Sequence, residues 1–155
     1  MRAQGLRCPL LLAGLLTLVL CGASAASLKA QSKFNCTQWR DLSPEVKRQL
    51  MSALIALAKQ RDMVTIRLTP EYYVHELDAL INRYVSTNNQ DALKGSVGIA
   101  WKTIVVMEGD WDNGEDPLDY AQKFMGKELF DTFRKIYPDK YQHLVDLHSG
   151  RQPSH

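Results

Sequence analysis

The sequence predicts an all-α protein that forms a single small bundle of five to six helices. Two segments, beginning at Ser43 and Thr69, open with the same Ser/Thr-Pro-Glu pattern and continue with apolar residues spaced three and four apart. No segment has an evident partner strand, and an isolated strand cannot satisfy its backbone hydrogen bonds. The chain has 155 residues, which suits one domain that buries a sizeable core.

The first 25 residues have the organisation of a cleaved signal peptide. Two arginines give a positive start, residues 10–20 form an apolar run, and Ala23-Ser24-Ala25 provides a cleavage site with small residues. The apolar run is shorter than the roughly 20 residues that a membrane-spanning helix requires. We therefore expect cleavage after Ala25, no stable membrane insertion, and a secreted or periplasmic mature chain.

Cleavage would leave a mature chain without net charge. The full sequence has 19 basic and 17 acidic residues, and two of the basic residues lie in the leader. Because no basic stripe remains, we expect neither nucleic acid nor an anionic membrane as a partner.

Cysteine use gives two further expectations. Cys8 and Cys21 lie in the leader, so Cys36 is the one cysteine of the mature chain and cannot form an intramolecular disulfide. We expect Cys36 to be buried and inert, the alternative being an exposed thiol that cross-links two chains. Lipidation of Cys21 is an alternative to cleavage after Ala25, although Leu20 stands where a lipoprotein signal has a small residue.

The helical domain, residues 43–148, follows a flexible, polar lead-in over residues 26–42. Ser43-Pro44 and Thr69-Pro70 supply the N-cap and the first residue of the first two helices. The second helix should end at the polar cluster of residues 86–89. The inward apolar positions are Val46, Leu50, Met51, Leu54, Ile55, Leu57 and Ala58 in the first helix, and Tyr73, Val74, Leu77, Leu80, Ile81, Tyr84 and Val85 in the second.

A third helix is predicted over residues 91–107. Gly95 and Gly98 each cost a helix about 1 kcal/mol relative to alanine, so we interpret them as a point of close approach between two helices. Asp116-Pro117 begins a fourth helix, which Gly126 caps or kinks.

The chain then continues with two more predicted helices and a polar end. The fifth helix carries Leu129, Phe130, Phe133, Ile136 and Tyr137, and Pro138 ends it. A short last helix around residues 141–147 precedes a disordered tail over residues 149–155.

The acidic residues between positions 108 and 119 are spaced almost as in a twelve-residue calcium loop. The candidate metal ligands are Glu108, Asp110, Asp112, Asp116 and Asp119. The pattern departs from a calcium loop at Asn113, which occupies the position of the usual glycine.

A structural interpretation of the same loop is favoured over the metal site. Gly109 would end the third helix, Asn113-Gly114 would form a tight turn, and Asp116 would cap the fourth helix. Trp111 would hold the loop against the body of the protein. In the alternative, Trp111 offers an exposed contact for a partner together with Tyr72, which lies off the main apolar stripe of its helix.

No pattern typical of a catalytic site is present. The sequence has no Gly-x-Ser-x-Gly elbow and no glycine-rich phosphate loop, and Cys36 has no identifiable base beside it. His75 lies between Glu71 and Asp78 on one helix, where ordinary surface charge pairs are favoured over a zinc site. We expect no enzyme and no cofactor, with hydrolysis by loop carboxylates as an alternative.

A set of residues in the first half of the mature chain resembles the layout of small exported bacterial proteins. The set is Cys36-x-x-Trp39, Leu42-Ser43, Lys47, Tyr72-Tyr73-x-x-Glu76-Leu77-Asp78 and Tyr84. Some of these proteins are similar to the helical periplasmic immunity proteins that neutralise secreted toxins. The resemblance implies an exported protein that binds another protein without enzymatic activity, in an immunity- or inhibitor-like role. The alternative is a small calcium-binding helical module that uses the acidic loop of residues 108–119.

Overall fold

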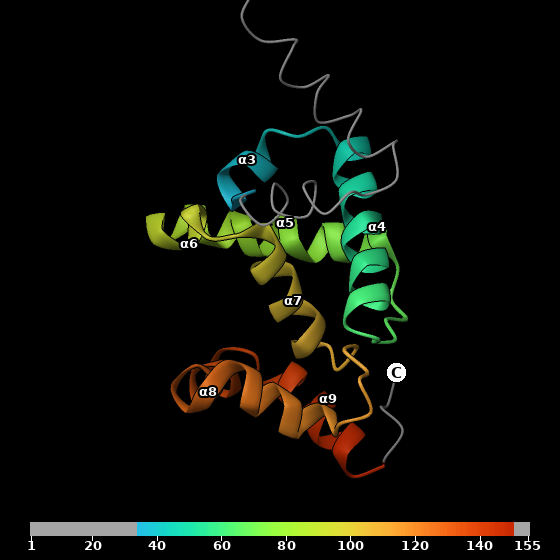
Figure 1. The fold of residues 1–155 in the computed structure, drawn as a ribbon. Helices are drawn as coiled ribbons and strands as arrows, with labels where there is room; N and C mark the ends of the chain where they lie inside the picture. The colour runs from blue at the N-terminus through green and yellow to red at the C-terminus, as the bar shows by residue number, and fades with distance from the viewer. Residues whose placement is uncertain (1–33, 151–155) are drawn as a thin grey trace, which may run out of the picture.

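The computed structural model describes residues 34–150, and in this part of the chain it has seven α-helices and no strand (Figure 1). The predicted all-α class is therefore confirmed. The helices are α3 (Cys36–Arg40), α4 (Pro44–Arg61), α5 (Pro70–Ser86), α6 (Gln90–Lys94), α7 (Val97–Met107), α8 (Pro117–Ile136) and α9 (Pro138–His148). The predicted signal peptide and most of the predicted tail lie outside the described residues.

The helices form two layers that α7 joins. In one layer α4 and α5 pack against each other and carry the short helices α3 and α6, whereas α8 and α9 form a hairpin in the other (Figure 1). α7 runs between the layers and packs against α5 on one side and against the hairpin on the other. The buried residues of α7 are Val97, Ala100, Trp101, Ile104, Val105 and Val106. Burial on several sides makes α7 the centre of the core.

Side-chain caps start the longer helices at the predicted residues. The Ser43 hydroxyl accepts a hydrogen bond from the N–H of Val46 (3.4 Å), and the Thr69 hydroxyl accepts one from the N–H of Tyr72 (3.2 Å). Asp116 accepts from two N–H groups in the first turn of α8. Each cap satisfies donors that have no partner within the helix.

The prediction of a flexible lead-in over residues 26–42 is wrong for its second half, which contains α3. Trp39 on this helix is fully buried. Its indole N–H donates to Oδ1 of Asp78 on α5 (2.7 Å), and the ammonium group of Lys47 donates to the same oxygen (2.8 Å). Burial of this large ring, whose N–H keeps a hydrogen-bond acceptor, stabilises α3 enough to order a segment of otherwise polar composition.

Cys36 is a buried free cysteine, as predicted. Burial raises the pKa of its thiol, which keeps the sulfur protonated and unreactive. Burial also raises the pKa of the partly buried Tyr84, and the charge of Cys36 contributes to this rise.

The predicted third helix is divided in two at Gly95 and Ser96. Gly95 has an extended backbone (ψ 156°) after α6, and α7 begins at Val97. The expected close approach of two helices is wrong for Gly98, whereas the start of α3 does meet Gly95, whose carbonyl accepts a hydrogen bond from the N–H of Cys36 (3.1 Å). A Cβ on Gly98 would meet only the Ser96 hydroxyl, at 3.6 Å, and the atoms nearest a Cβ on Gly95 belong to the same segment of chain. Gly98 instead lines a surface groove.

The predicted fourth and fifth helices form one kinked helix, α8. Gly126 interrupts it with a positive φ (φ 72°, ψ 165°), so the predicted kink is confirmed. Pro138 follows the end of α8 and also takes the first position of α9, where its missing N–H costs nothing.

Candidate functional site

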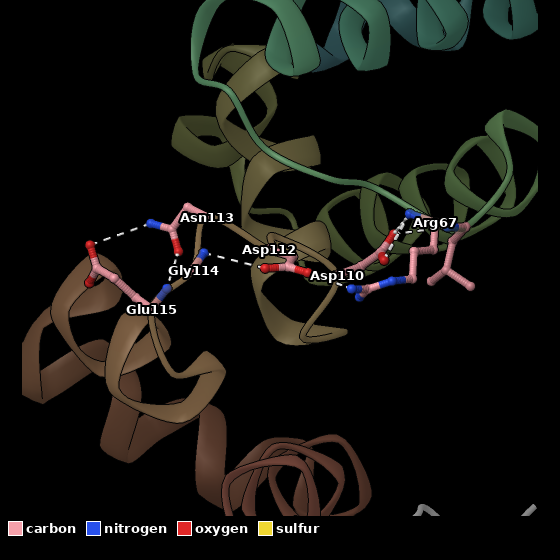
Figure 2. Close-up of polar contacts among 7 residues, drawn as sticks. Arg67, Asp110, Asp112, Asn113, Gly114 and Glu115 are labelled. Atoms are coloured by element: carbon pink, nitrogen blue, oxygen red, sulfur yellow. Dashed lines mark hydrogen bonds and ion pairs between the residues drawn. The ribbon is translucent and has the colours of Figure 1, made fainter.

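Asp110, at the centre of the acidic loop, is the one buried charged residue among residues 34–150. Its carboxylate accepts hydrogen bonds from the backbone N–H groups of Arg67 (2.9 and 3.0 Å) and Leu68 (2.9 Å) (Figure 2). It also accepts a bond from the hydroxyl of Tyr73 on α5 (2.6 Å). Three donors of the chain bind this carboxylate, and Oδ2 accepts from all three of them. The carboxylate thus ties the 63–69 loop, α5 and the end of α7 together.

Glu108 belongs to a second polar cluster, at the junction of α5, α7 and α9. The ammonium group of Lys140 forms ion pairs with Glu108 and, at 3.2 Å, with Glu76. Burial alone would lower the pKa of Lys140, but the hydrogen bonds and charges of the carboxylates raise it. Burial, with a further contribution from Glu108, raises the pKa of Tyr72 to about 12. Glu108 is therefore already paired with a cation of its own chain.

Asp112 holds the turn of the acidic loop. Its backbone exchanges two hydrogen bonds with Thr65 (2.8 and 3.1 Å), and its carboxylate pairs with Arg67. Figure 2 shows the tight turn that follows, in which the side chains of Asp112 and Asn113 accept from the N–H groups two residues further on (3.3 and 3.1 Å). These are local turn contacts of the kind that Asp and Asn side chains make.

Asp116 and Asp119 lie at the start of α8, near the end of α9. Oδ1 of Asp116 accepts from the N–H groups of Leu118 (3.0 Å) and Asp119 (3.1 Å), and Oδ2 lies 3.0 Å from Nδ1 of His148. Burial would raise the pKa of Asp116, but the bonds from Asp119 N–H and His148 lower it on balance. Among residues 34–150, Asp116, Asp119 and His148 are the one group of three potential metal-binding side chains whose ligand atoms lie close together.

The five predicted calcium ligands therefore do not surround one point. Calcium requires six to eight oxygens around a single centre, whereas only Asp116 and Asp119 of the five share a cluster. The structural interpretation of the loop fits its geometry: Gly109 and Gly114 have positive φ (67° and 84°), and Asp116 caps α8. The acidic loop is a closed polar corner of the fold.

Trp111 is buried, so the expectation of an exposed contact at this residue is wrong and its role in holding the loop is confirmed. Its ring lies in an aromatic row whose members are Trp101, Trp111, Tyr120 and Phe124. The ammonium group of Lys102 lies 3.9 Å from the centre of the Trp111 ring, which is a cation–π contact. Tyr72 is half-buried beside Glu108 and likewise presents no free ring.

Two open, mainly apolar grooves flank α7, and the sequence analysis does not predict them. The first, which we call the α4 groove, is lined by α4, α7 and α8 and has a volume of about 580 Å³. The second, the α5 groove, is lined mainly by α5, α7 and α8 and has a volume of about 520 Å³. Thr103, Met125 and Leu129 line both grooves, so the two meet around the exposed side of α7.

Large apolar side chains are exposed along these grooves. The accessible fraction is 68% for Ile99, 54% for Leu129 and 55% for Ile136. Leu129 and Ile136 stay exposed because α8 buries the adjacent Phe130 and Phe133 against Tyr141 of α9. The seven-residue interval between Leu129 and Ile136 is the signal that places both on one helix face.

Two further findings bear on function. Within residues 34–150, no helix combines the length and the apolar character that crossing a bilayer requires. A comparison of the chain with protein-family models, with curated proteins and with solved structures finds no match.

Proposed function

We propose that this chain is an exported helical protein without enzymatic activity that binds another protein through the grooves around α7. The observation that carries the proposal is the exposure of Ile99, Leu129 and Ile136 along two connected apolar grooves. Soluble proteins seldom expose large apolar side chains together unless another molecule covers them. Covering this surface would remove it from water and supply the main favourable term of association.

The shape of the surface favours a protein over a small molecule. Sites for small molecules bury most of their ligand, whereas these grooves open to solvent around α7. Charged residues accompany the apolar lining: Arg61, Asp62 and Lys102 in the α4 groove, and Glu76, Arg83 and Lys140 in the α5 groove. An apolar centre with a polar rim is the usual composition of a protein interface.

The polar clusters of the acidic loop support the non-enzymatic part of the proposal. Asp110 accepts hydrogen bonds from three donors of the chain, and Glu108 is paired with Lys140. Both carboxylates are therefore engaged within the fold. The organisation of residues 1–25 supports export, and the resemblance in the first half of the mature chain suggests an immunity- or inhibitor-like role.

Site-specific photo-crosslinking in cells of the source organism tests the binding surface. A benzophenone amino acid replaces Ile99 or Leu129 or, as a matched control, Met63, which is 82% accessible and lines neither groove. We expect cross-links to another protein from positions 99 and 129 and none from position 63. Absence of cross-links from both groove positions, or equal cross-linking from all three, would contradict the proposal.

The intact mass of the chain purified from the same cells tests export. We expect a chain that begins at Ala26, because cleavage after a small residue removes the leader. A chain that keeps its first 25 residues would contradict export without bearing on the binding surface.

A further inference from the structure

We propose that the occupant of the grooves is an acidic, amphipathic helical segment of the partner protein, an inference that rests on the proposed protein-binding function. The observation is an imbalance of charge within the grooves. Each acidic lining residue is already paired with a base, whereas each groove keeps one base without a carboxylate partner among the described residues.

The acids of the lining are paired within the chain. In the α4 groove, Asp62 accepts two hydrogen bonds from the guanidinium group of Arg61 (2.8 and 2.9 Å). In the α5 groove, Glu76 is paired with Lys140 at 3.2 Å, but Lys140 also pairs with Glu108, which does not line the groove. The acids are therefore balanced in the α4 groove and only partly balanced in the α5 groove.

The two remaining bases have aromatic partners instead of carboxylates. Lys102 in the α4 groove lies over the ring of Trp111 at 3.9 Å and acts on Asp62 only as a more distant charge. Arg83 in the α5 groove donates to the hydroxyl of Tyr137 (2.7 Å) and lies over its ring at 5.0 Å. A cation over an aromatic ring keeps its capacity to attract a carboxylate, so both grooves present a positive charge inside an apolar wall.

A third unsatisfied group in this region is also a donor. Trp101 lines the α4 groove, and its buried indole N–H has no hydrogen-bond acceptor among the described residues. A buried donor without an acceptor is costly. Because this N–H is buried, the two bases are the groups that an occupant can reach, and both call for negative charge.

The geometry favours a helix as the form of that occupant. Helices wall both grooves, and residues 34–150 contain no strand whose edge could pair with an extended peptide. The α5 groove follows α5 from Glu76 to Thr87, a length of about 16 Å at the rise of an α-helix. That length accommodates about three turns, with apolar residues facing α7 and carboxylates facing Arg83, whereas Lys102 offers the same charge to the part of the occupant that lies in the α4 groove.

A displayed library of random 16-residue peptides, selected on the mature chain, tests the inference. The chain with Ile99→Gln and Leu129→Gln serves for counter-selection, because it removes apolar surface from the grooves and adds no charge. We expect enriched peptides to carry net negative charge and apolar residues spaced three and four apart. Changing the acids of one such peptide to glutamine should weaken its binding by about tenfold or more.

Charge reversal of the two bases identifies the groove. Arg83→Glu or Lys102→Glu should abolish the preference for acidic peptides. Lys127→Glu is the surface control, because Lys127 lines neither the α4 groove nor the α5 groove. Arg83→Gln and Lys102→Gln remove the positive charge without replacing it by a negative one, so they should weaken the preference for acidic peptides less than the reversals do. Circular dichroism checks that each variant is folded.

Three results would overturn the inference. Enriched peptides that depend on Ile99 and Leu129 but are neutral or basic would contradict the acidic occupant and leave the proposed function standing. An acidic preference that both reversals leave intact would place the binding elsewhere. A dimer that Leu129→Asp dissociates would make a second copy of the chain the occupant. If no peptide is enriched over the counter-selected chain, the proposed function itself fails.

Discussion

Tyr73 and Asp110 meet in the interior through a hydrogen bond of 2.6 Å, donated by the tyrosine hydroxyl to the carboxylate. The bond joins the middle of the acidic loop to α5, and the N–H groups of Arg67 and Leu68 complete the coordination of the carboxylate. A feature that looks like a cation site in the sequence is thus an internal anchor. The binding surface that we propose lies elsewhere, around α7.

Removing this anchor should destabilise the protein far more than removing its exposed neighbour. Asp110→Ala leaves one buried hydroxyl and two partly buried N–H groups without an acceptor, so we expect a loss of about 3 kcal/mol in the free energy of unfolding. Asp112→Ala removes a partly exposed pair with Arg67 and should cost less than about 1 kcal/mol. Urea denaturation of both variants measures the difference, and equal losses would contradict the role of Asp110.

Calcium should not stabilise the protein. A ligand that binds only the folded state raises its apparent stability, but the five loop carboxylates are not arranged around one centre. We expect the same melting temperature in millimolar calcium as in a chelator, within the precision of calorimetry. A rise that Asp112→Ala abolishes would show that the loop binds the ion after all.

The stability of the protein should fall as the pH rises from about 10 to about 12. The pKa of Tyr72 is raised to about 12 by burial and by Glu108. In this range the unfolded chain loses the tyrosine proton while the folded chain retains it, so the folded state binds more protons and loses stability with increasing pH. Lys140, whose pKa is also raised, contributes with the same sign.

Tyr72→Phe removes one of these groups and should give a shallower fall in stability over that range, with little change at neutral pH. Urea denaturation as a function of pH measures it. An unchanged slope would show that Tyr72 titrates normally in the folded protein.

Gly109 should tolerate a side chain less well than Gly114. Both have positive φ, which costs an alanine about 1 kcal/mol or more. A Cβ on Gly109 would also lie 2.6 Å from Cδ1 of Leu147 and 3.1 Å from Cδ2 of Leu144, whereas a Cβ on Gly114 meets nothing within 4 Å. We expect Gly109→Ala to cost about 1 kcal/mol more than Gly114→Ala in thermal unfolding. Equal costs would mean that the leucines move aside freely.

Much of the fold could be predicted because its determinants are local. The caps at Ser43, Thr69 and Asp116 and the kink at Gly126 depend on neighbouring residues alone, and the sequence shows them directly. α3 has a local signal that was missed, because Asn35 and Gln38 form a capping box at its start. Its anchoring could not be predicted, because it depends on the contact of Trp39 with Asp78, 39 residues away. Polar composition suggested a flexible segment where one buried ring imposes a helix.

The candidate surface was harder to predict than the fold. Periodicity identifies Leu129, Phe130, Phe133 and Ile136 as apolar positions of one helix, but it does not show which of them a neighbouring helix covers. That depends on how the α8–α9 hairpin packs, and hence on tertiary contacts. In the acidic loop, by contrast, the sequence suggests a site that the structure does not form. The carboxylates are spaced as in a metal site, but Asp110 accepts hydrogen bonds from its own chain.

The most direct test of the account is the amount of partner protein that co-purifies with the mature chain, measured by quantitative mass spectrometry. Wild type is compared with Leu129→Asp and with Val85→Asp, a control at a 39% accessible residue that lines neither groove. We predict one protein that wild type and Val85→Asp retain equally and that Leu129→Asp loses by about tenfold or more. Equal retention of that protein by all three chains would contradict binding through the grooves around α7.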